Sequence, residues 1–206
     1  MQKKPRKLHG GDIYRHPDVI DFSVNTNPLG TPESVKRAVQ ESVAKIEHYP
    51  DVRCEALRKA ISRFEQVNME EILCGNGAAE VIFTLCRAVK PKKALLPAPT
   101  FAEYGQALES TDCKLEYYML TENEGFVLGE SYLDILHKGL DMAFLCNPNN
   151  PTGMLIPHRL LKRILEKCRK LGILLVVDEC FLDFVKEPEE YSLKRSLSGF
   201  NNLFIL

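Results

Sequence analysis

The chain has 206 residues, of which 45% are hydrophobic and 27% charged, so it can form one sizeable core and has the composition of a globular protein. Lysine and arginine together number 27, against 28 aspartates and glutamates, and this balance gives no global basis for binding nucleic acid or membrane surfaces. No apolar run reaches transmembrane length, and the basic start MQKKPRK lacks the apolar segment of a secretory signal.

The cysteines favour a reducing environment. There are 7 of them, without CxxC spacing, and most lie inside apolar runs such as EILCGN and AFLCNP. We therefore predict reduced, buried thiols in a cytoplasmic protein, and neither a metal site nor a disulfide framework.

The first part of the chain predicts two helices after a loop-rich opening. VIDFS at 19–23 is a short apolar segment that NTNPLGTP interrupts. Apolar residues recur at helical spacing from Glu33 to about Ile46, and again from 53 to 65. We expect the second helix to bury Leu57, Ile61 and Phe64.

From residue 71 onward, strand-like and helix-like patterns alternate. The predicted strands are 71–75, 93–97, 113–120, 142–146, 173–179 and 201–206. The predicted helices are 77–89, 101–110, 130–138 and 159–172. Continuous apolar strands that alternate with helices predict an α/β fold with a mainly parallel sheet covered on both faces.

Four polar loops follow predicted strands. They read GNGAAE (75–80), APTFAEY (98–104), NPNNPTG (147–153) and DECF (178–181). Because open α/β sheets bind ligands at the carboxyl ends of their strands, we expect the four loops to share one pocket.

Two of these loops have chemistry suited to a charged ligand. Small residues at 75–79, directly before a helix, let the backbone approach a phosphate and point free N–H groups at it. Asp178 ends an apolar strand, where a carboxylate needs a cationic or hydrogen-bonding partner.

Each residue also has an ordinary structural interpretation. GNG is also typical of a tight turn, and Asp178 of a helix cap or a structural ion pair. Tyr104 is compatible with core packing, and Asn150 with a plain turn.

Taken together, the four loops resemble fold type I pyridoxal-phosphate enzymes of the class I/II aminotransferase superfamily. The resemblance extends from about His9 to the last residue, and its most specific part is NNPTG followed by VVDE. Within that superfamily the chain resembles the branch that contains histidinol-phosphate aminotransferases and L-threonine-O-3-phosphate decarboxylases. It implies a three-layer α/β/α large domain at 31–206, a substrate-contacting segment at 1–30, and a homodimer.

The resemblance also implies roles for individual residues around pyridoxal 5'-phosphate. Gly77 and the amides of Ala78 and Ala79 would hold the cofactor phosphate. Asp178 would pair with the protonated ring nitrogen and keep the ring an electron sink. Tyr104 would stack on the pyridine ring, and Asn150 would form a hydrogen bond with the phenolic oxygen of that ring. Tyr49 of HYPD would reach across a dimer interface to the cofactor phosphate of the partner subunit.

Smaller features favour the decarboxylase branch. HGGD at 9–12 and DFSVNTNPLG at 21–30 resemble the decarboxylases, and Phe181 stands where aminotransferases generally have tyrosine. By this resemblance His9 and Gly10 would contact the phosphate of the substrate, and Asn25 and Asn150 would contact the amino-acid end of the substrate. A histidine near a chain terminus is also often simply solvated. The implied reaction is decarboxylation of L-threonine O-3-phosphate, a small phosphorylated amino acid, to (R)-1-aminopropan-2-yl phosphate in cobalamin biosynthesis. The alternative is transamination of histidinol phosphate or another amino acid.

The family's Schiff-base lysine is expected in a serine-x-x-lysine segment soon after the strand that NNLFIL begins, and the sequence stops first. Lys194 in SLKRS precedes that strand and is a poor substitute. We therefore expect this chain to be the cofactor-binding part of a longer enzyme and to have no turnover alone. A non-catalytic remnant that binds a cofactor or a partner is the alternative from a different class.

Overall fold

The computed structural model describes residues 10–206, so His9 lies outside the described residues. The chain forms two compact units, one that extends to Val52 and one from Arg53 to Leu206. The functional boundary predicted at residue 30 stays a prediction.

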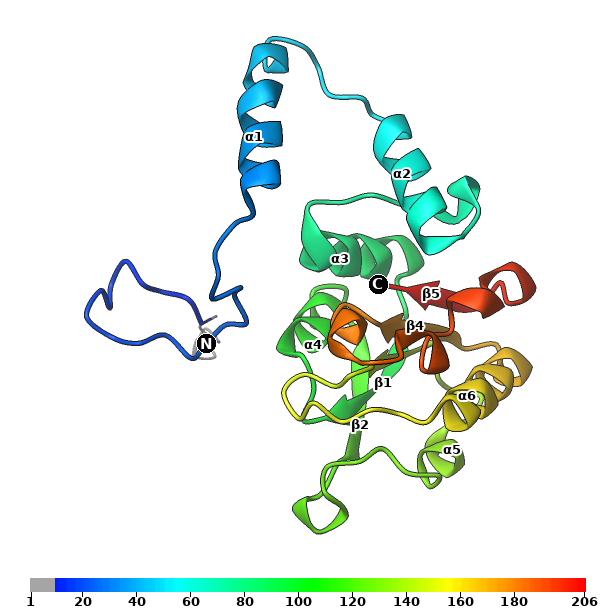
Figure 1. Ribbon diagram of the computed structural model, residues 1–206. Helices are drawn as coiled ribbons and strands as arrows, with labels where there is room; N and C mark the ends of the chain where they lie inside the picture. The colour runs from blue at the N-terminus through cyan, green and yellow to red at the C-terminus, as the bar shows by residue number, and fades with distance from the viewer. Residues whose placement is uncertain (1–9) are drawn as a thin grey trace. The chain divides into compact units, whose positions relative to one another are not determined.

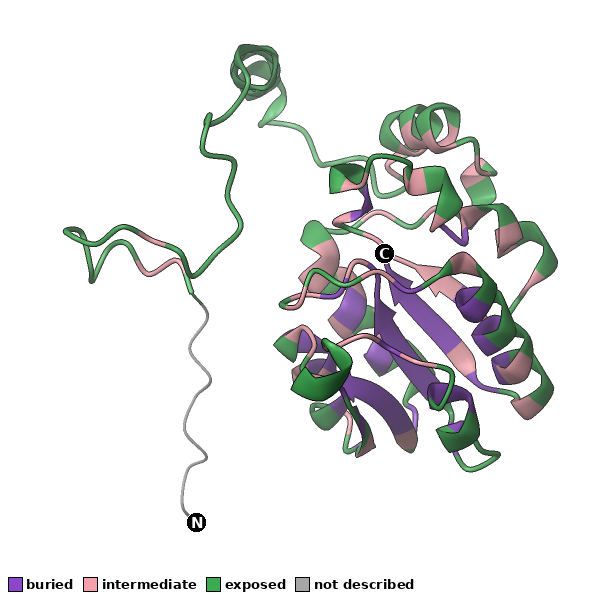
Figure 2. Cartoon of the chain, turned by 60° about the horizontal axis from the view of Figure 1, so that its bottom comes forward, coloured by how far each residue is buried: buried purple, intermediate pink, exposed green. Residues whose placement is uncertain are grey.

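The first unit is built around one helix. α1 (Glu33–Ser42) continues into a 3₁₀ turn (Val43–Lys45), as the helical spacing predicts. Its apolar stripe is exposed within the described residues, as the green colour of this unit in Figure 2 shows. The segment 19–23 forms no strand.

The second unit contains a sheet of five parallel strands in the order β2-β1-β3-β4-β5 (Figure 1). The strands are β1 (Lys93–Ala98), β2 (Lys114–Met119), β3 (Met142–Cys146), β4 (Leu174–Asp178) and β5 (Leu203–Ile205). The α-helices are α2 (Glu55–Glu65), α3 (Gly77–Val89), α4 (Ala102–Glu109), α5 (Tyr132–Ile135) and α6 (His158–Leu171). The prediction of a parallel α/β fold is confirmed.

Alternate residues of the strands pack on opposite faces of the sheet. Leu96 and Phe144 belong to one core cluster, together with apolar residues of α3 and α4. Their strand neighbours Leu95 and Leu145 belong to a second cluster, with apolar residues of α5 and α6. Figure 2 shows the buried strands in purple between these helices. The sheet is therefore the middle of three layers, and each large apolar side chain that it buries contributes about 1.5–3 kcal/mol.

Two predictions for the segment before α3 are wrong. Residues 71–75 form no strand: a 3₁₀ turn (Met69–Glu71) precedes Ile72, whose backbone is extended (φ −106°, ψ 125°) but pairs with no strand among the described residues. The burial predicted for α2 is wrong for Leu57 and Phe64, which are 52% and 81% exposed among the described residues, whereas Ile61 is partly buried. Arg58 Nη2 donates to the Met69 carbonyl oxygen at 2.7 Å and ties α2 to the 3₁₀ turn that follows it.

No helix among residues 10–206 is long and apolar enough to cross a membrane.

Candidate functional site

The strand order has a topological switch point between β1 and β3. β2 pairs with β1 on one side of the sheet, and β3, β4 and β5 follow one another on the other side. The direction in which successive strands are added therefore reverses between β1 and β3. Ligands of open α/β sheets bind at the carboxyl ends of the strands at such a switch point. Here Thr100 Oγ1, after β1, donates to Asn149 Oδ1, after β3, at 2.9 Å. Two of the predicted loops therefore meet at the switch point.

The asparagines of the loop after β3 have different surroundings. Asn147 is fully buried: its Oδ1 accepts from the Ile156 amide at 2.8 Å, and its Nδ2 donates to the Tyr191 carbonyl oxygen at 3.2 Å. Asn149 Nδ2 donates to the Pro99 carbonyl oxygen at 3.1 Å. The Asn150 side chain forms no hydrogen bond within residues 10–206 and is available to a ligand.

Asp178 lies beside this loop, because Cys146 at the end of β3 is its register partner. The carboxylate is 6% exposed; its Oδ2 accepts from the Tyr104 hydroxyl at 2.6 Å, and its Oδ1 accepts from the Cys180 amide at 3.0 Å. Both donors are neutral, and no cationic side chain of the described part of the chain forms an ion pair with Asp178. A buried carboxylate without a counter-charge is costly, so this arrangement is suited to a cationic ligand.

The position of Tyr104 differs from the expectation that it stacks on the cofactor ring. Its ring is 0% exposed and stacks on Phe144, with 4.9 Å between the centroids and 18° between the planes. Its other ring contact is the edge of Phe101, whose centroid lies 5.5 Å away at an interplanar angle of 77°. A ring that the protein covers completely offers no face to a ligand, so the stacking role of Tyr104 is corrected.

Phe101 is a second aromatic residue after β1 and contacts the ring of Tyr104. It is the N-cap residue of α4 and is only partly buried. The signal for it was its place in the sequence, since it is the first aromatic residue after β1 and therefore the nearest to the carboxyl end of that strand.

The start of α3 has the form of an anion site. Gly77 has φ +82°, a left-handed conformation that favours glycine. In the first turn the amides of Ala78 and Ala79 donate to no acceptor among the described residues. Ala78 also packs on the core cluster that contains Tyr104 and Cys146, so α3 begins on the same side of the sheet as those residues.

Neighbouring residues hold this turn in shape. A Cβ at Gly75 would lie 2.7 Å from Val81 Cγ2, too close for any larger residue without a shift. Glu80 Oε2 accepts from the Asn76 amide at 2.5 Å, so a carboxylate already binds one of the N–H groups at the helix N-terminus.

Gly10 and Asn25, two of the four residues predicted to contact substrate, belong to the first unit, which is described by itself. A Cβ at Gly10 would lie 2.4 Å from the Ser23 carbonyl oxygen, and the Gly11 amide donates to Ser23 Oγ at 2.8 Å. Gly10 and Gly11 thus lie against Ser23. Asn25 and Tyr49 are exposed, and their predicted roles stay predictions.

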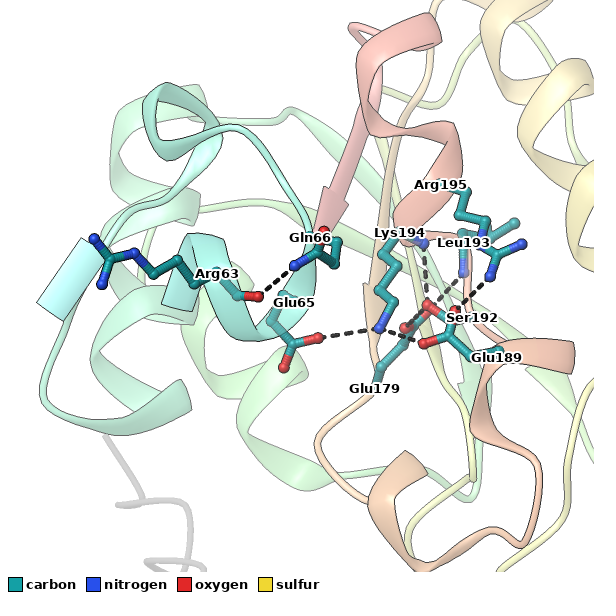
Figure 3. A network of polar contacts seen from close by, with 9 residues as sticks. All are labelled: Arg63, Glu65, Gln66, Glu179, Glu189, Ser192, Leu193, Lys194 and Arg195. Atoms are coloured by element: carbon teal, nitrogen blue, oxygen red, sulfur yellow. Dashed lines mark hydrogen bonds and ion pairs between the residues drawn. The ribbon is translucent and has the colours of Figure 1, made fainter. Parts of the chain in front are cut away.

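Lys194 is held in ion pairs with two carboxylates (Figure 3). Its Nζ lies 2.6 Å from Glu189 Oε1 and 3.2 Å from Glu65 Oε2, which joins the segment before β5 to α2. The hydrogen bond with Glu189 is the main cause that raises the pKa of Lys194 above its ordinary 10.5. A protonated amine is a poor nucleophile, so the structure supports the expectation that Lys194 does not replace the family's lysine.

Glu179 connects the same segment to the end of β4 (Figure 3). Its Oε1 accepts from the Leu193 amide at 2.8 Å, and its Oε2 accepts from Ser192 Oγ at 2.6 Å. Burial raises the pKa of Glu179. Glu179 therefore fixes the chain that leads into β5, directly after Asp178.

The fold and this site define a class of protein. Residues 17–205 match the family described as aminotransferase class I and II, and the chain belongs to this family. The family depends on pyridoxal phosphate. Three features of the described residues fit that group: the buried Asp178 carboxylate without a cationic partner, the Asn150 side-chain amide without a hydrogen bond, and the two unbonded backbone amides at the start of α3.

Within the family, the chain is similar to two kinds of enzyme. The chain is 41% identical to the threonine-phosphate decarboxylase of Salmonella typhimurium, over 96% of this chain and 56% of that protein. It is 30% identical to the histidinol-phosphate aminotransferase of Methanocaldococcus jannaschii, over 92% of this chain and 50% of that protein. The chain thus spans about half the length of the curated relatives it matches.

Solved structures give the same two neighbours. The histidinol-phosphate aminotransferase from Clostridium acetobutylicum superimposes with a TM-score of 0.79 at 27% identity, over 91% of this chain and 54% of that one. The L-threonine-O-3-phosphate decarboxylase from Porphyromonas gingivalis superimposes with a TM-score of 0.70 at 25% identity, over 85% and 50%.

Proposed function

We propose that the whole protein decarboxylates L-threonine O-3-phosphate with pyridoxal phosphate and that this chain supplies the cofactor-binding part. The product would be (R)-1-aminopropan-2-yl phosphate, which serves cobalamin biosynthesis. The observation that carries the cofactor proposal is Asp178, which is 6% exposed and whose carboxylate is bound, among residues 10–206, only by neutral donors. The 41% identity to a threonine-phosphate decarboxylase supports the choice of reaction.

In this proposal each cofactor contact comes from a residue that the fold leaves available. Asp178 faces the protonated ring nitrogen, and the Asn150 amide donates to the phenolic oxygen. The amides of Ala78 and Ala79 bind the phosphate at the start of α3. Phe101, which keeps part of its ring exposed, takes the stacking role first given to Tyr104. When bound, the cofactor supplies an electron sink for the bond that breaks beside the substrate amine.

The first unit would serve the substrate and the dimer. His9, Gly10 and Asn25 would bind the phosphorylated amino acid, and Tyr49 would contact the cofactor phosphate of the partner subunit in a cytoplasmic homodimer. Support for this part comes from the resemblance and from the close packing of Gly10 against Ser23.

Transamination of histidinol phosphate is the second candidate. The structural match to the Clostridium acetobutylicum aminotransferase has the higher TM-score, 0.79 against 0.70 for the decarboxylase. Phe181 argues against transamination, because phenylalanine has no hydroxyl with which to bind the phenolic oxygen.

A fusion protein tests the reaction. This chain would be joined to the C-terminal part of the Salmonella typhimurium relative that lies beyond the region of similarity, and the chain alone would serve as the control. We expect the fusion to release CO₂ from L-threonine O-3-phosphate and to form no keto acid from histidinol phosphate and 2-oxoglutarate. Keto-acid formation without CO₂ release would instead assign the protein to the aminotransferases.

A further inference from the structure

We propose that Tyr104 is a positioning residue that holds Asp178 in the orientation in which it binds the ring nitrogen of the cofactor. This inference rests on the proposed cofactor function. It gives Tyr104 a role through Asp178 in place of direct contact with the cofactor.

The geometry of Tyr104 leaves its hydroxyl little freedom. The residue lies in the first turn of α4, whereas Asp178 ends β4, so the 2.6 Å hydrogen bond joins two elements on different sides of the switch point. Stacking on Phe144 of β3 and the edge contact with Phe101 fix the plane of the ring. The hydroxyl is therefore aimed at Asp178 Oδ2 before any ligand binds.

The hydroxyl can act only as a donor to the carboxylate. Burial, followed by the neighbouring Cys146 and Asp178, raises the pKa of Tyr104 far above its ordinary 10.0, so the hydroxyl keeps its proton. A hydrogen bond donated to a carboxylate oxygen fixes the direction in which that oxygen points. The Cys180 amide donates to the other oxygen, Oδ1, at 3.0 Å and prevents the carboxylate from rotating.

These contacts have a consequence for ligand binding. A carboxylate held in one orientation binds a protonated ring nitrogen more strongly than one that is free to rotate. Removing the Tyr104 hydroxyl should therefore weaken a ligand that has this nitrogen and leave a ligand without it unaffected. A merely structural role for Tyr104 would weaken both ligands equally.

The test compares two ligands on the 206-residue chain by isothermal titration calorimetry. Pyridoxamine 5'-phosphate has the ring nitrogen and carries no aldehyde to react with lysines, and its 1-deaza analogue has carbon in place of that nitrogen. We expect Tyr104→Phe to raise the Kd of pyridoxamine 5'-phosphate about tenfold, or about 1.4 kcal/mol. The Kd of the deaza analogue should change less than about twofold.

Tyr118→Phe is the matched control. Tyr118 is also a buried tyrosine, with its hydroxyl 2.7 Å from Ser131 Oγ, but it packs in the core cluster on the opposite face of the sheet. This variant should bind both ligands as the unaltered chain does.

The outcomes separate this inference from the proposed function. If the unaltered chain does not bind pyridoxamine 5'-phosphate, the cofactor proposal fails and this inference fails with it. If the chain binds and Asp178→Asn weakens binding, but Tyr104→Phe changes neither ligand or both equally, only the inference on Tyr104 is overturned. Should Tyr104→Phe not fold by circular dichroism, Phe144→Leu removes the stacked ring and keeps the hydroxyl, and unchanged affinity for pyridoxamine 5'-phosphate then overturns the inference.

Discussion

The asparagines at 147 and 150 lie in one loop, but the structure gives them opposite tasks. The Asn147 side chain is fully buried and joins the Ile156 amide to the Tyr191 carbonyl oxygen, whereas the Asn150 side chain forms no bond within the described part of the chain. The first stabilises the loop, and the second is left for the ligand.

We predict that Asn147→Ala lowers the free energy of unfolding by about 1–3 kcal/mol, because a buried donor and a buried acceptor lose their partners. Asn150→Ala should change it by less than about 0.5 kcal/mol, as is usual for a side chain without such contacts. Urea denaturation of both variants measures the difference. Equal stabilities would show that the Asn147 bonds do not hold the loop.

Lys194 is predicted to react slowly with pyridoxal phosphate. Its pKa is raised above 10.5, mainly by Glu189, so the fraction of free amine at pH 8 lies below that of an ordinary lysine. Borohydride reduction followed by peptide mapping should label Lys194 less than the exposed Lys170. Glu189→Gln removes one ion-pair partner, lowers the pKa of Lys194 and should increase its labelling. Stoichiometric labelling of Lys194 in the unaltered chain would contradict this account.

Single residues were predicted from the sequence with uneven success, for physical reasons. A carboxylate at the end of an apolar strand needs a partner, so the sequence singles out Asp178, whose role at the cofactor stays a prediction. The sequence does not distinguish Tyr104 from Phe101, because both follow β1. Only the packing of Phe144 against Tyr104 shows which of the two rings is covered.

At the scale of elements, the start of α3 depends on backbone conformation. Gly77 has φ +82°, and no atom lies within 4 Å of a Cβ built there, so a substitution is penalised by backbone strain and not by a clash. Its conformation sets the direction in which the amides of Ala78 and Ala79 point.

Gly77→Ala should therefore destabilise the chain by about 1–2 kcal/mol, the cost of a left-handed conformation for a residue with a Cβ. Gly199→Ala is the matched control, because a Cβ there also meets nothing within 4 Å and its φ lies outside the left-handed range. Thermal unfolding of both variants measures the effect. A Gly77→Ala variant as stable as Gly199→Ala would show that this turn is not strained.

Most elements from β1 onward agree with the sequence because hydrophobic spacing and burial coincide there, as in α6, where the spacing predicts a helix at 159–172 and the structure has His158–Leu171. The helix predicted at 130–138 is shorter in the structure, where α5 spans only Tyr132–Ile135. Residues 71–75 were predicted as a strand from their apolar content alone. A strand also needs a neighbour with which to pair, and the described chain provides none for this segment. The burial of the apolar side of α2 likewise depends on which element packs against it, and the spacing of apolar residues in the sequence does not reveal that element.

For the whole molecule, the order β2-β1-β3-β4-β5 is the feature that assembles the site. Sequence patterns predicted parallel strands but not their order, which depends on the direction of each crossover. Because the order reverses between β1 and β3, the loops after these strands share hydrogen bonds, and Asp178 of β4 lies next to them.

The central claim is that Asp178 provides the counter-charge for the cofactor's ring nitrogen. Titration of the chain with pyridoxamine 5'-phosphate, compared between Asp178→Asn and the exposed control Asp183→Asn, tests it most directly. Breaking a buried ion pair by removing one partner costs about 3–5 kcal/mol, so Asp178→Asn should weaken binding at least about a hundredfold. Asp183→Asn should bind as the unaltered chain does. Equal affinity of the Asp178→Asn variant and the unaltered chain would contradict the cofactor site proposed for this protein.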